Sequence, residues 1–297
     1  MSLAEGPPDL PCPKLPFWDT VSLSYSTYFS HFIDALRASW LWLIVVAALT
    51  GVASWLQWSW MAVAMANMKP GLAPLMPKST EMEVLLNLDN ILLPLAGVSI
   101  AVAWHRLVIL NEHPGLSGSN IATKNLWRYI IVGLALFLIM FLPVAAVMFP
   151  AFYFLLRAPA GRAPLPPGFF PLILLIFVVY AVGIAVSLRL TLLLPARAIG
   201  NTSLTFRQTW NRTRGNIWRM FWGIVATTIP PLLIAQVLFL FGIGAPHPGM
   251  AVGEDFVARM TAASTVFTIY YLLVVPIGIG FLSHAYRHFF QTPLELA

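Results

Sequence analysis

Charged residues are scarce in this chain. Asp, Glu, Lys and Arg make up 9% of its 297 residues, and hydrophobic residues make up 59%. Soluble domains carry about 25% charged residues, so this chain cannot cover itself with a water-compatible surface. Together with the mean hydropathy of +0.80, this predicts an integral membrane protein. The net charge of +6 is then no nucleic-acid signal in itself, because membrane proteins collect Lys and Arg on their cytoplasmic loops.

Cysteine and buried acids are also lacking. The single cysteine, Cys12, excludes an internal disulfide and a cysteine-based metal cluster. None of the eleven acidic residues lies deep in an apolar segment. Paired carboxylates, HExxH, GxSxG and a Gly-rich phosphate loop are all missing from the sequence. We therefore predict a protein that is not an enzyme, with no cofactor and no bound metal.

Long apolar segments are abundant. A helix needs about 20 mostly apolar residues to cross a bilayer, and six segments qualify. They are residues 40–65, 90–110, 129–156, 169–195, 219–244 and 263–284. Their prolines predict kinks and do not argue against helices, because membrane helices tolerate proline where neighbouring groups bond the freed backbone. The predicted fold class is an all-α, polytopic membrane protein with six transmembrane helices.

The basic residues predict the orientation. With both termini on one side, twelve of the seventeen Lys and Arg fall on that side and five on the other. The positive-inside rule assigns the richer side to the cytoplasm. We expect a multi-pass protein of a bacterial inner membrane, with cytoplasmic N- and C-termini.

Three stretches share one plan, which predicts an internal repeat. Residues 20–42, 117–131 and 202–222 each begin with Ser, Thr or Asn, which are good N-cap residues, and each runs through a Trp into an apolar span. The repeat anchors are Trp40, Arg106, Trp127, Arg128 and Arg287. The predicted organisation is an irregular Pro-rich leader (1–19), a membrane domain (20–290) with tandem units 20–112, 117–200 and 202–290, and a short tail (291–297). Alternatively, any transmembrane hairpin needs such anchors at its cytoplasmic ends.

The third stretch is the most basic. "LTFRQTWNRTRGNIWRMFW" (204–222) interleaves arginine with tryptophan. A helix over 203–213, capped by Ser203 or Thr202 and broken at Gly215-Asn216, would lie in the membrane interface. Nucleic acid would need a larger basic face, so we predict none. The residues expected to meet lipid headgroups, preferably anionic ones, are Arg189, Arg197, Arg207, Trp210, Arg212, Arg214, Trp218 and Arg219. The alternative is a topology determinant and anchor without a headgroup pocket.

Two further groups of polar residues have alternative interpretations. His105, His284 and His288 could share a metal, but interfacial side chains beside arginines are the simpler interpretation. A polar patch inside one span consists of Thr227, Thr228 and Gln236. It is either a kinked helix whose Thr hydroxyls bond their own backbone, or unwound backbone that lines a site.

A resemblance to a known group supports the membrane assignment. "RLTLLLPARAIG" (189–200), "SLTFRQTWNRTRGNIWRMF" (203–221) and "AVAWHRLVILNE" (101–112) resemble recurring segments of a bacterial multispan inner-membrane family without assigned function. That group includes the membrane domain of some glycerophosphodiester phosphodiesterases. The resemblance implies a helical fold in a bacterial inner membrane and no catalytic residues, because the phosphodiesterase domain is absent.

Three functions remain open from the sequence. The first is a scaffold or accessory subunit that acts through lipid headgroups or through partner membrane proteins of a larger complex. The second is a transporter or permease for a neutral or amphiphilic small molecule, which the absence of charge inside the spans favours over an ion. The third is the membrane domain of a lipid-related enzyme.

Overall fold

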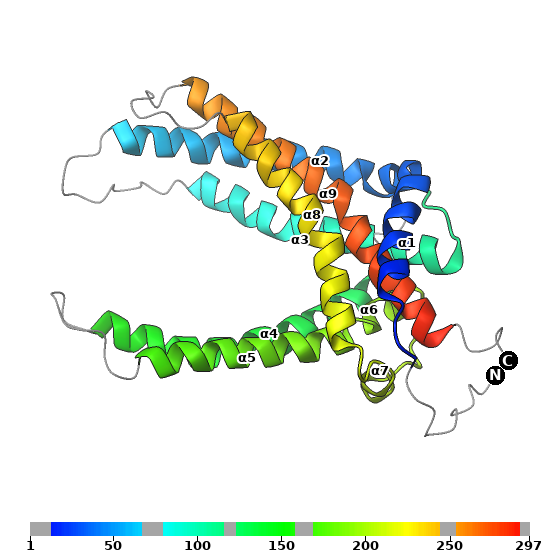
Figure 1. The fold of residues 1–297 in the computed structure, drawn as a ribbon. Coiled ribbons are helices and arrows are strands. Elements are labelled where there is room, and N and C mark those ends of the chain that lie inside the picture. The colour runs from blue at the N-terminus through cyan, green and yellow to red at the C-terminus, as the bar shows by residue number, and fades with distance from the viewer. Residues whose placement is uncertain (1–12, 67–79, 116–122, 158–168, 244–253, 292–297) are drawn as a thin grey trace.

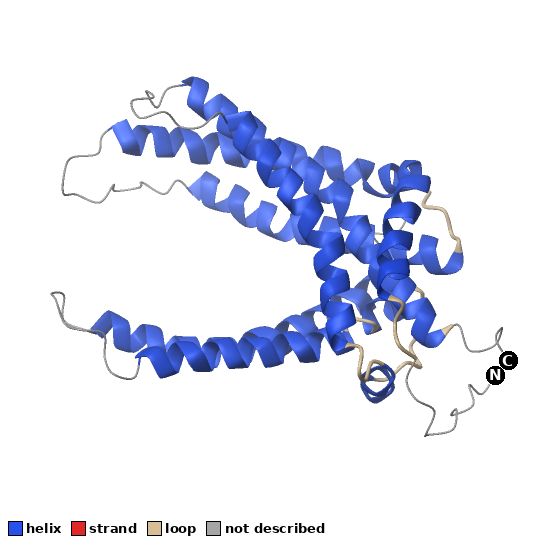
Figure 2. Ribbon diagram, in the orientation of Figure 1, coloured by secondary structure: helices blue, strands red, loops and turns tan. Residues whose placement is uncertain are grey.

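The computed structural model describes residues 13–66, 80–115, 123–157, 169–243 and 254–291, and within these ranges it is helical with no strand (Figures 1 and 2). The helices are α1 (Phe17–Ser30), α2 (Phe32–Ala66), α3 (Thr80–Leu110), α4 (Lys124–Arg157), α5 (Phe169–Leu190), α6 (Leu193–Ala198), α7 (Phe206–Arg212), α8 (Ile217–Ile243) and α9 (Glu254–Phe290). Six of them, α2, α3, α4, α5, α8 and α9, are long and apolar enough to span a membrane. The predicted all-α fold with six transmembrane helices is confirmed.

Most helices extend beyond the predicted apolar segments; α9, for example, begins at Glu254 rather than 263 and ends at Phe290 rather than 284. The first stretch, expected as one segment over 20–42, is two helices, because α1 ends at Ser30 and α2 begins at Phe32. The fourth span ends at Leu190 rather than 195, and the chain turns before it enters the short α6. Helix α3 begins at Thr80, ahead of the apolar segment that starts at 90, as its Thr-x-x-Glu sequence favours.

Helix α9 is the centre of the main bundle. It contacts α1, α2, α3 and α8, and these five helices lie together in Figure 1. Small residues permit the close approaches, as is common between membrane helices. A Cβ placed on Gly280 of α9 would lie 3.3 Å from Trp104 Nε1 of α3 and 3.7 Å from Ser24 Cα of α1. These two contacts show how closely α1 and α3 pack against α9.

Helices α4 and α5 form a separate hairpin. They pack against each other, with Gly183 of α5 placed so that a Cβ would be 3.5 Å from the backbone of Met140 in α4. Only 11% of the most apolar window of each helix is buried within the molecule, against 50% for α3. Figure 1 shows the hairpin diverging from the bundle along its length and meeting it at one end. Most of the hairpin surface is therefore left for lipid or another membrane segment.

The end at which the hairpin meets the bundle is called the rim. It consists of residues 13–31, 106–115, 123–128, 189–219 and 284–291. Four contacts join segments of the rim that are distant in sequence: Arg106 Nη1 to the Ala198 carbonyl (3.2 Å), Asn201 Nδ2 to Tyr286 Oη (3.1 Å), Arg219 Nη1 to the Leu15 carbonyl (2.6 Å) and Thr27 Oγ1 with His284 Nε2 (3.0 Å). The segments that the sequence predicts to be cytoplasmic thus gather at one end of the molecule.

Candidate functional site

Helix α7 is a short rim helix with a complete capping box. The hydroxyl of Thr205 accepts a hydrogen bond from the Gln208 backbone N–H (3.3 Å), and the Gln208 side chain accepts one from the Thr205 backbone N–H (2.8 Å). The predicted caps, Ser203 and Thr202, are wrong. Thr205 is the one residue of the three with Gln or Glu three positions later, and this is what a reciprocal capping box requires.

The predicted break at Gly215-Asn216 is present and holds the beginning of the described chain. Gly215 has a φ of +80°, which a residue without a Cβ adopts readily. Asn216 is 1% exposed, and its Oδ1 accepts a hydrogen bond from Leu15 N–H (2.9 Å) while its Nδ2 donates to the Pro13 carbonyl (3.1 Å). This side chain therefore fastens residues 13–15 against the start of α8.

The arginines predicted to bind lipid headgroups fall into two sets. Those of the first set donate hydrogen bonds to backbone carbonyls of the protein itself. Arg189 donates to the Trp210 carbonyl (2.7 Å) and lies 3.7 Å above the centre of the Trp210 ring. Arg197 donates to the Leu204 carbonyl (3.0 Å), and Arg219 donates to the Leu15 carbonyl (2.6 Å). These guanidinium groups fix the backbone of the rim, so their main role is in the fold.

Burial and a neighbouring cation act on Arg197. Burial lowers the pKa of its guanidinium, and the nearby charge of Arg128 lowers it further. Arginine stays protonated at neutral pH in spite of such shifts. Two cations therefore lie close together at the rim, an arrangement that an anion would stabilise.

The second set is exposed. Arg207, Arg212 and Arg214 all lie on the surface of α7 and of the turn that follows it. Large aromatic side chains are exposed beside them in the sequence: Phe206 (48%), Trp210 (39%), Trp218 (72%) and Trp222 (54%). We call these seven residues the α7 patch. Basic and amphipathic aromatic side chains together are typical of the membrane interface, where the cations meet phosphate groups and the rings meet the headgroup level.

The repeat anchors are less alike than the sequence suggests. Trp40 and Trp127 are both exposed near the start of their helices, as Trp218 is. Arg106 binds the Glu112 carboxylate (2.6 Å) as well as a backbone carbonyl, Arg128 is half-buried, and Arg287 is exposed. A short helix precedes α2 and α8, whereas the described part of the second stretch runs directly into α4 and residues 117–122 lie outside the described residues. The tandem repeat stays a prediction.

The predicted polar patch lies on an uninterrupted helix. Helix α8 is continuous through Pro230 and Pro231, so the backbone here is not unwound. The Thr227 hydroxyl donates to the Gly223 carbonyl of its own helix (2.8 Å), and Thr228 Oγ1 would lie 3.2 Å from a Cβ on Gly278 of α9. Gln236 is exposed among apolar neighbours. The two threonines thus serve helix packing, and Gln236 is apart from them.

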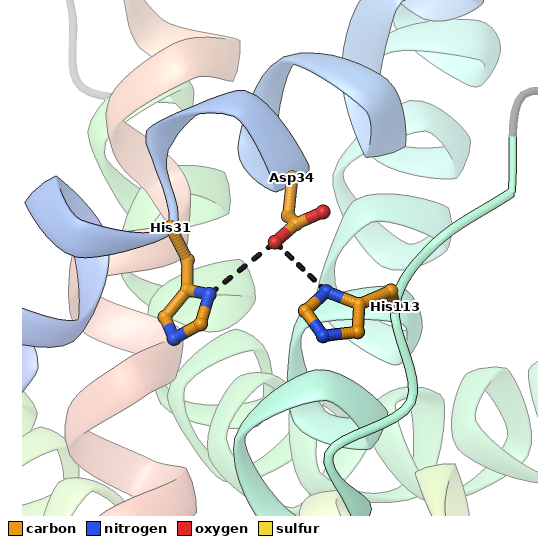
Figure 3. A group of neighbouring side chains, drawn as sticks. All are labelled: His31, Asp34 and His113. Carbon is orange, nitrogen blue, oxygen red and sulfur yellow. Dashed lines mark hydrogen bonds and ion pairs between the residues drawn. The ribbon is translucent and has the colours of Figure 1, made fainter.

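The histidines considered from the sequence do not share a site. Nδ1 of His105 pairs with Ser283 Oγ (2.7 Å), Nε2 of His284 pairs with Thr27 Oγ1 (3.0 Å), and the ring of His288 packs on Phe289. Within the described part of the chain, a different group could hold a metal: His31, Asp34 and His113 (Figure 3). The spacing of His31 and Asp34, three residues apart, is visible in the sequence. The approach of His113 is not, because it depends on how α3 ends.

The described part of the chain has a polar pocket at the rim and an apolar pocket between α8 and α9. A polar pocket of about 290 Å³ lies at the rim and is lined by Ala103, Arg106, Glu112, His113, Pro114, Gly115, Thr123 and Asn125. An apolar pocket of about 150 Å³ is lined by residues of α8 and α9 alone, from Ala235 to Phe239 and from Ala262 to Tyr270. The apolar pocket therefore lies within the bundle, not between it and the α4–α5 hairpin.

Comparison of the chain with models of known protein families, with curated protein sequences and with solved structures finds no match in any of the three.

Proposed function

We propose that this is a non-enzymatic protein of a bacterial inner membrane, with cytoplasmic termini, which acts as a scaffold or accessory subunit by holding anionic lipid headgroups at its rim. The main support for the proposal is that some of the rim arginines bond the protein's own backbone whereas others are exposed. Arg189, Arg197 and Arg219 are used by the fold, whereas Arg207, Arg212 and Arg214 are exposed beside exposed aromatic rings.

The energetics favour anionic lipids as the partner of the α7 patch. Each basic residue near a membrane surface contributes about 1 kcal/mol of attraction to anionic lipids. Aromatic side chains on the same helix add a preference for the interface. Two exposed arginines on a capped helix and a third in the turn that follows it therefore supply both charge and a fixed position for headgroup phosphates.

The proposal is tested by measuring how much anionic lipid stays bound to the protein through mild purification. The variant R212Q/R214Q removes about 2 kcal/mol of attraction, which corresponds to roughly thirtyfold weaker anionic lipid binding. Native mass spectrometry should then show fewer phosphatidylglycerol and cardiolipin molecules per chain.

The matched control for that test is K14Q/K124Q. It removes the same charge from two exposed rim residues outside the α7 patch, so it measures the lipid lost through general attraction to the rim, and we expect R212Q/R214Q to lose more. Equal lipid retention by R212Q/R214Q and the wild type would refute the proposal. Equal losses in both variants would show only a general electrostatic attraction of the rim to anionic lipid, and would also contradict a site at the α7 patch.

A second candidate, a permease for an amphiphilic small molecule, has one observation in its favour. The α4–α5 hairpin is attached to the bundle mainly at the rim, and its two apolar windows are only 11% buried. An amphiphile could enter sideways from lipid between such elements. The same mass spectra distinguish the two functions, because a permease would retain one defined small molecule and the loss of rim arginines would not alter it.

A further inference from the structure

Two histidines and a carboxylate meet at the junction of α1 and α2. Nδ1 of His31 lies 3.3 Å from Asp34 Oδ2, and Nδ1 of His113 lies 3.0 Å from the same oxygen. All three donor atoms lie within 4.8 Å of one another. Figure 3 shows both rings turned with Nδ1 toward the carboxylate. We call this group the His-Asp-His cluster.

The geometry points to a binding site for a divalent transition metal ion of the Zn²⁺ type at the His-Asp-His cluster. Zinc binds His nitrogen and carboxylate oxygen at about 2.0–2.2 Å in a tetrahedral arrangement, which places neighbouring donor atoms about 3.3 Å apart. The two nitrogen–oxygen distances already have this value within a few tenths of an ångström. The three ligand atoms lie within 4.8 Å of one another, and rotation of the two exposed rings can bring their nitrogens to the third tetrahedral edge.

The backbone holds the three donors from two separate elements. His31 is the C-cap that follows α1; its N–H donates to the Thr27 carbonyl (3.0 Å), and its own carbonyl accepts from Ala35 N–H (3.0 Å) in α2. Asp34 occupies the first turn of α2. His113 follows the end of α3, where Asn111 has a φ of +56°. A bound ion would therefore tie the α1–α2 junction to the segment that leaves α3.

The hydrogen bond to the second carboxylate oxygen of Asp34 and the burial of this residue are consistent with a role as a metal ligand. The second oxygen of Asp34, Oδ1, accepts a hydrogen bond from Arg37 (3.3 Å), and such contacts orient the carboxylate that binds a metal. Asp34 is 7% exposed. Burying a carboxylate costs free energy unless cations or hydrogen-bond donors compensate for the lost water, and a bound metal ion would add to that compensation. Each imidazole would bind as the tautomer protonated on Nε2.

The site is open to solvent from the histidine side. The side chains of His31 and His113 are 36% and 54% exposed, and His113 also lines the polar rim pocket of about 290 Å³. Three protein ligands leave one tetrahedral position for water or another ligand. Imidazole and carboxylate donors favour Zn²⁺ over Mg²⁺ and Ca²⁺, which prefer oxygen ligands alone.

The test is metal binding by the full chain, with any purification tag of histidines removed. The chain is stripped with a chelator, and ZnCl₂ alone is added during calorimetric titration. We expect about one Zn²⁺ per wild-type chain. His113→Ala and Asp34→Asn should each weaken binding by more than about tenfold, since the loss of even an outer-shell partner costs 10–100-fold. At the same concentration, Zn²⁺ should also raise the Tm of the wild type more than that of either variant.

His288→Gln is the matched control. It removes one rim histidine that packs on Phe289 in α9, and it should bind Zn²⁺ like the wild type. His113→Ala changes an exposed side chain outside any helix, so it tests the site without disturbing a span. A wild type without stoichiometric Zn²⁺ binding would overturn the inference, and so would equal binding by the wild type, His113→Ala and Asp34→Asn. In either case the cluster is a hydrogen-bonded group only.

Discussion

At the scale of single residues, Asn216 shows how one side chain fastens a segment. It is buried and bonds both Leu15 N–H and the Pro13 carbonyl. Replacing it with Ala leaves the buried Leu15 N–H without this acceptor, which costs about 1–3 kcal/mol. We therefore expect Asn216→Ala to release residues 13–16 and to speed hydrogen exchange there. Proline has no amide hydrogen, so exchange in this segment reports on Lys14 and Leu15 alone.

Asn216→Asp is the informative comparison for that experiment. Its carboxylate keeps the acceptor for Leu15 N–H but loses the donor for the Pro13 carbonyl. The exchange of Leu15 should then stay slow while that of Asn216→Ala is fast. If all three proteins exchange alike, Arg219, which donates to the Leu15 carbonyl, holds the segment without Asn216.

At the scale of helices, Gly223 permits the closest approach of α8 to α9 among the glycines at this contact. A Cβ at Gly223 would lie 2.0 Å from Cζ of Phe281, which is fully buried. The rigid ring has to shift for any side chain to fit, and such overpacking costs about 1–3 kcal/mol. We expect Gly223→Ala to lower the free energy of unfolding by this amount in mixed detergent micelles.

Gly97 in α3 is the matched control. A Cβ there would meet nothing within 4 Å, and Ala is a better helix former than Gly by about 1 kcal/mol. Gly97→Ala should therefore be neutral or stabilising. Equal destabilisation by both substitutions would show that the α8–α9 contact is not the cause.

At this scale, the sequence predicts the features that depend on residues close together in the chain. Length and hydropathy are local, so the six spans are predictable, and the Thr205–Gln208 capping box is also readable in the sequence, although the prediction names Ser203 or Thr202. The break at His31 has no proline or glycine to mark it. The meeting of Asp34 with His113, 79 residues apart, and the division of the arginines depend on tertiary packing. Composition and periodicity carry no information about these.

At the scale of the whole molecule, the α4–α5 hairpin is attached mainly at the rim, so its tilt should follow the bilayer. A spanning segment adapts to bilayer thickness by tilting, and few contacts oppose this here. With Cys12 changed to Ser, spin labels at Leu142 of α4 and Leu88 of α3, both exposed, can report the separation. We expect electron paramagnetic resonance distances to differ between thin and thick bilayers.

Labels at Val52 of α2 and Val266 of α9 provide the control pair. Both positions are exposed, and the two helices pack together in the bundle. Their separation should stay constant while the first pair changes. If neither pair responds to thickness, the hairpin is held rigidly at its angle to the bundle.

The divergence of the hairpin also has a consequence for the shape of the surrounding bilayer. The helices converge at the rim and spread away from it (Figure 1), so the cross-section of the molecule differs between the two leaflets. In the predicted orientation the narrow end lies in the cytoplasmic leaflet and the broad end in the outer one. A wedge of this kind favours a membrane that is convex on its outer face and concave on its cytoplasmic face, and a crowded array of such molecules would impose this curvature without a dedicated coat.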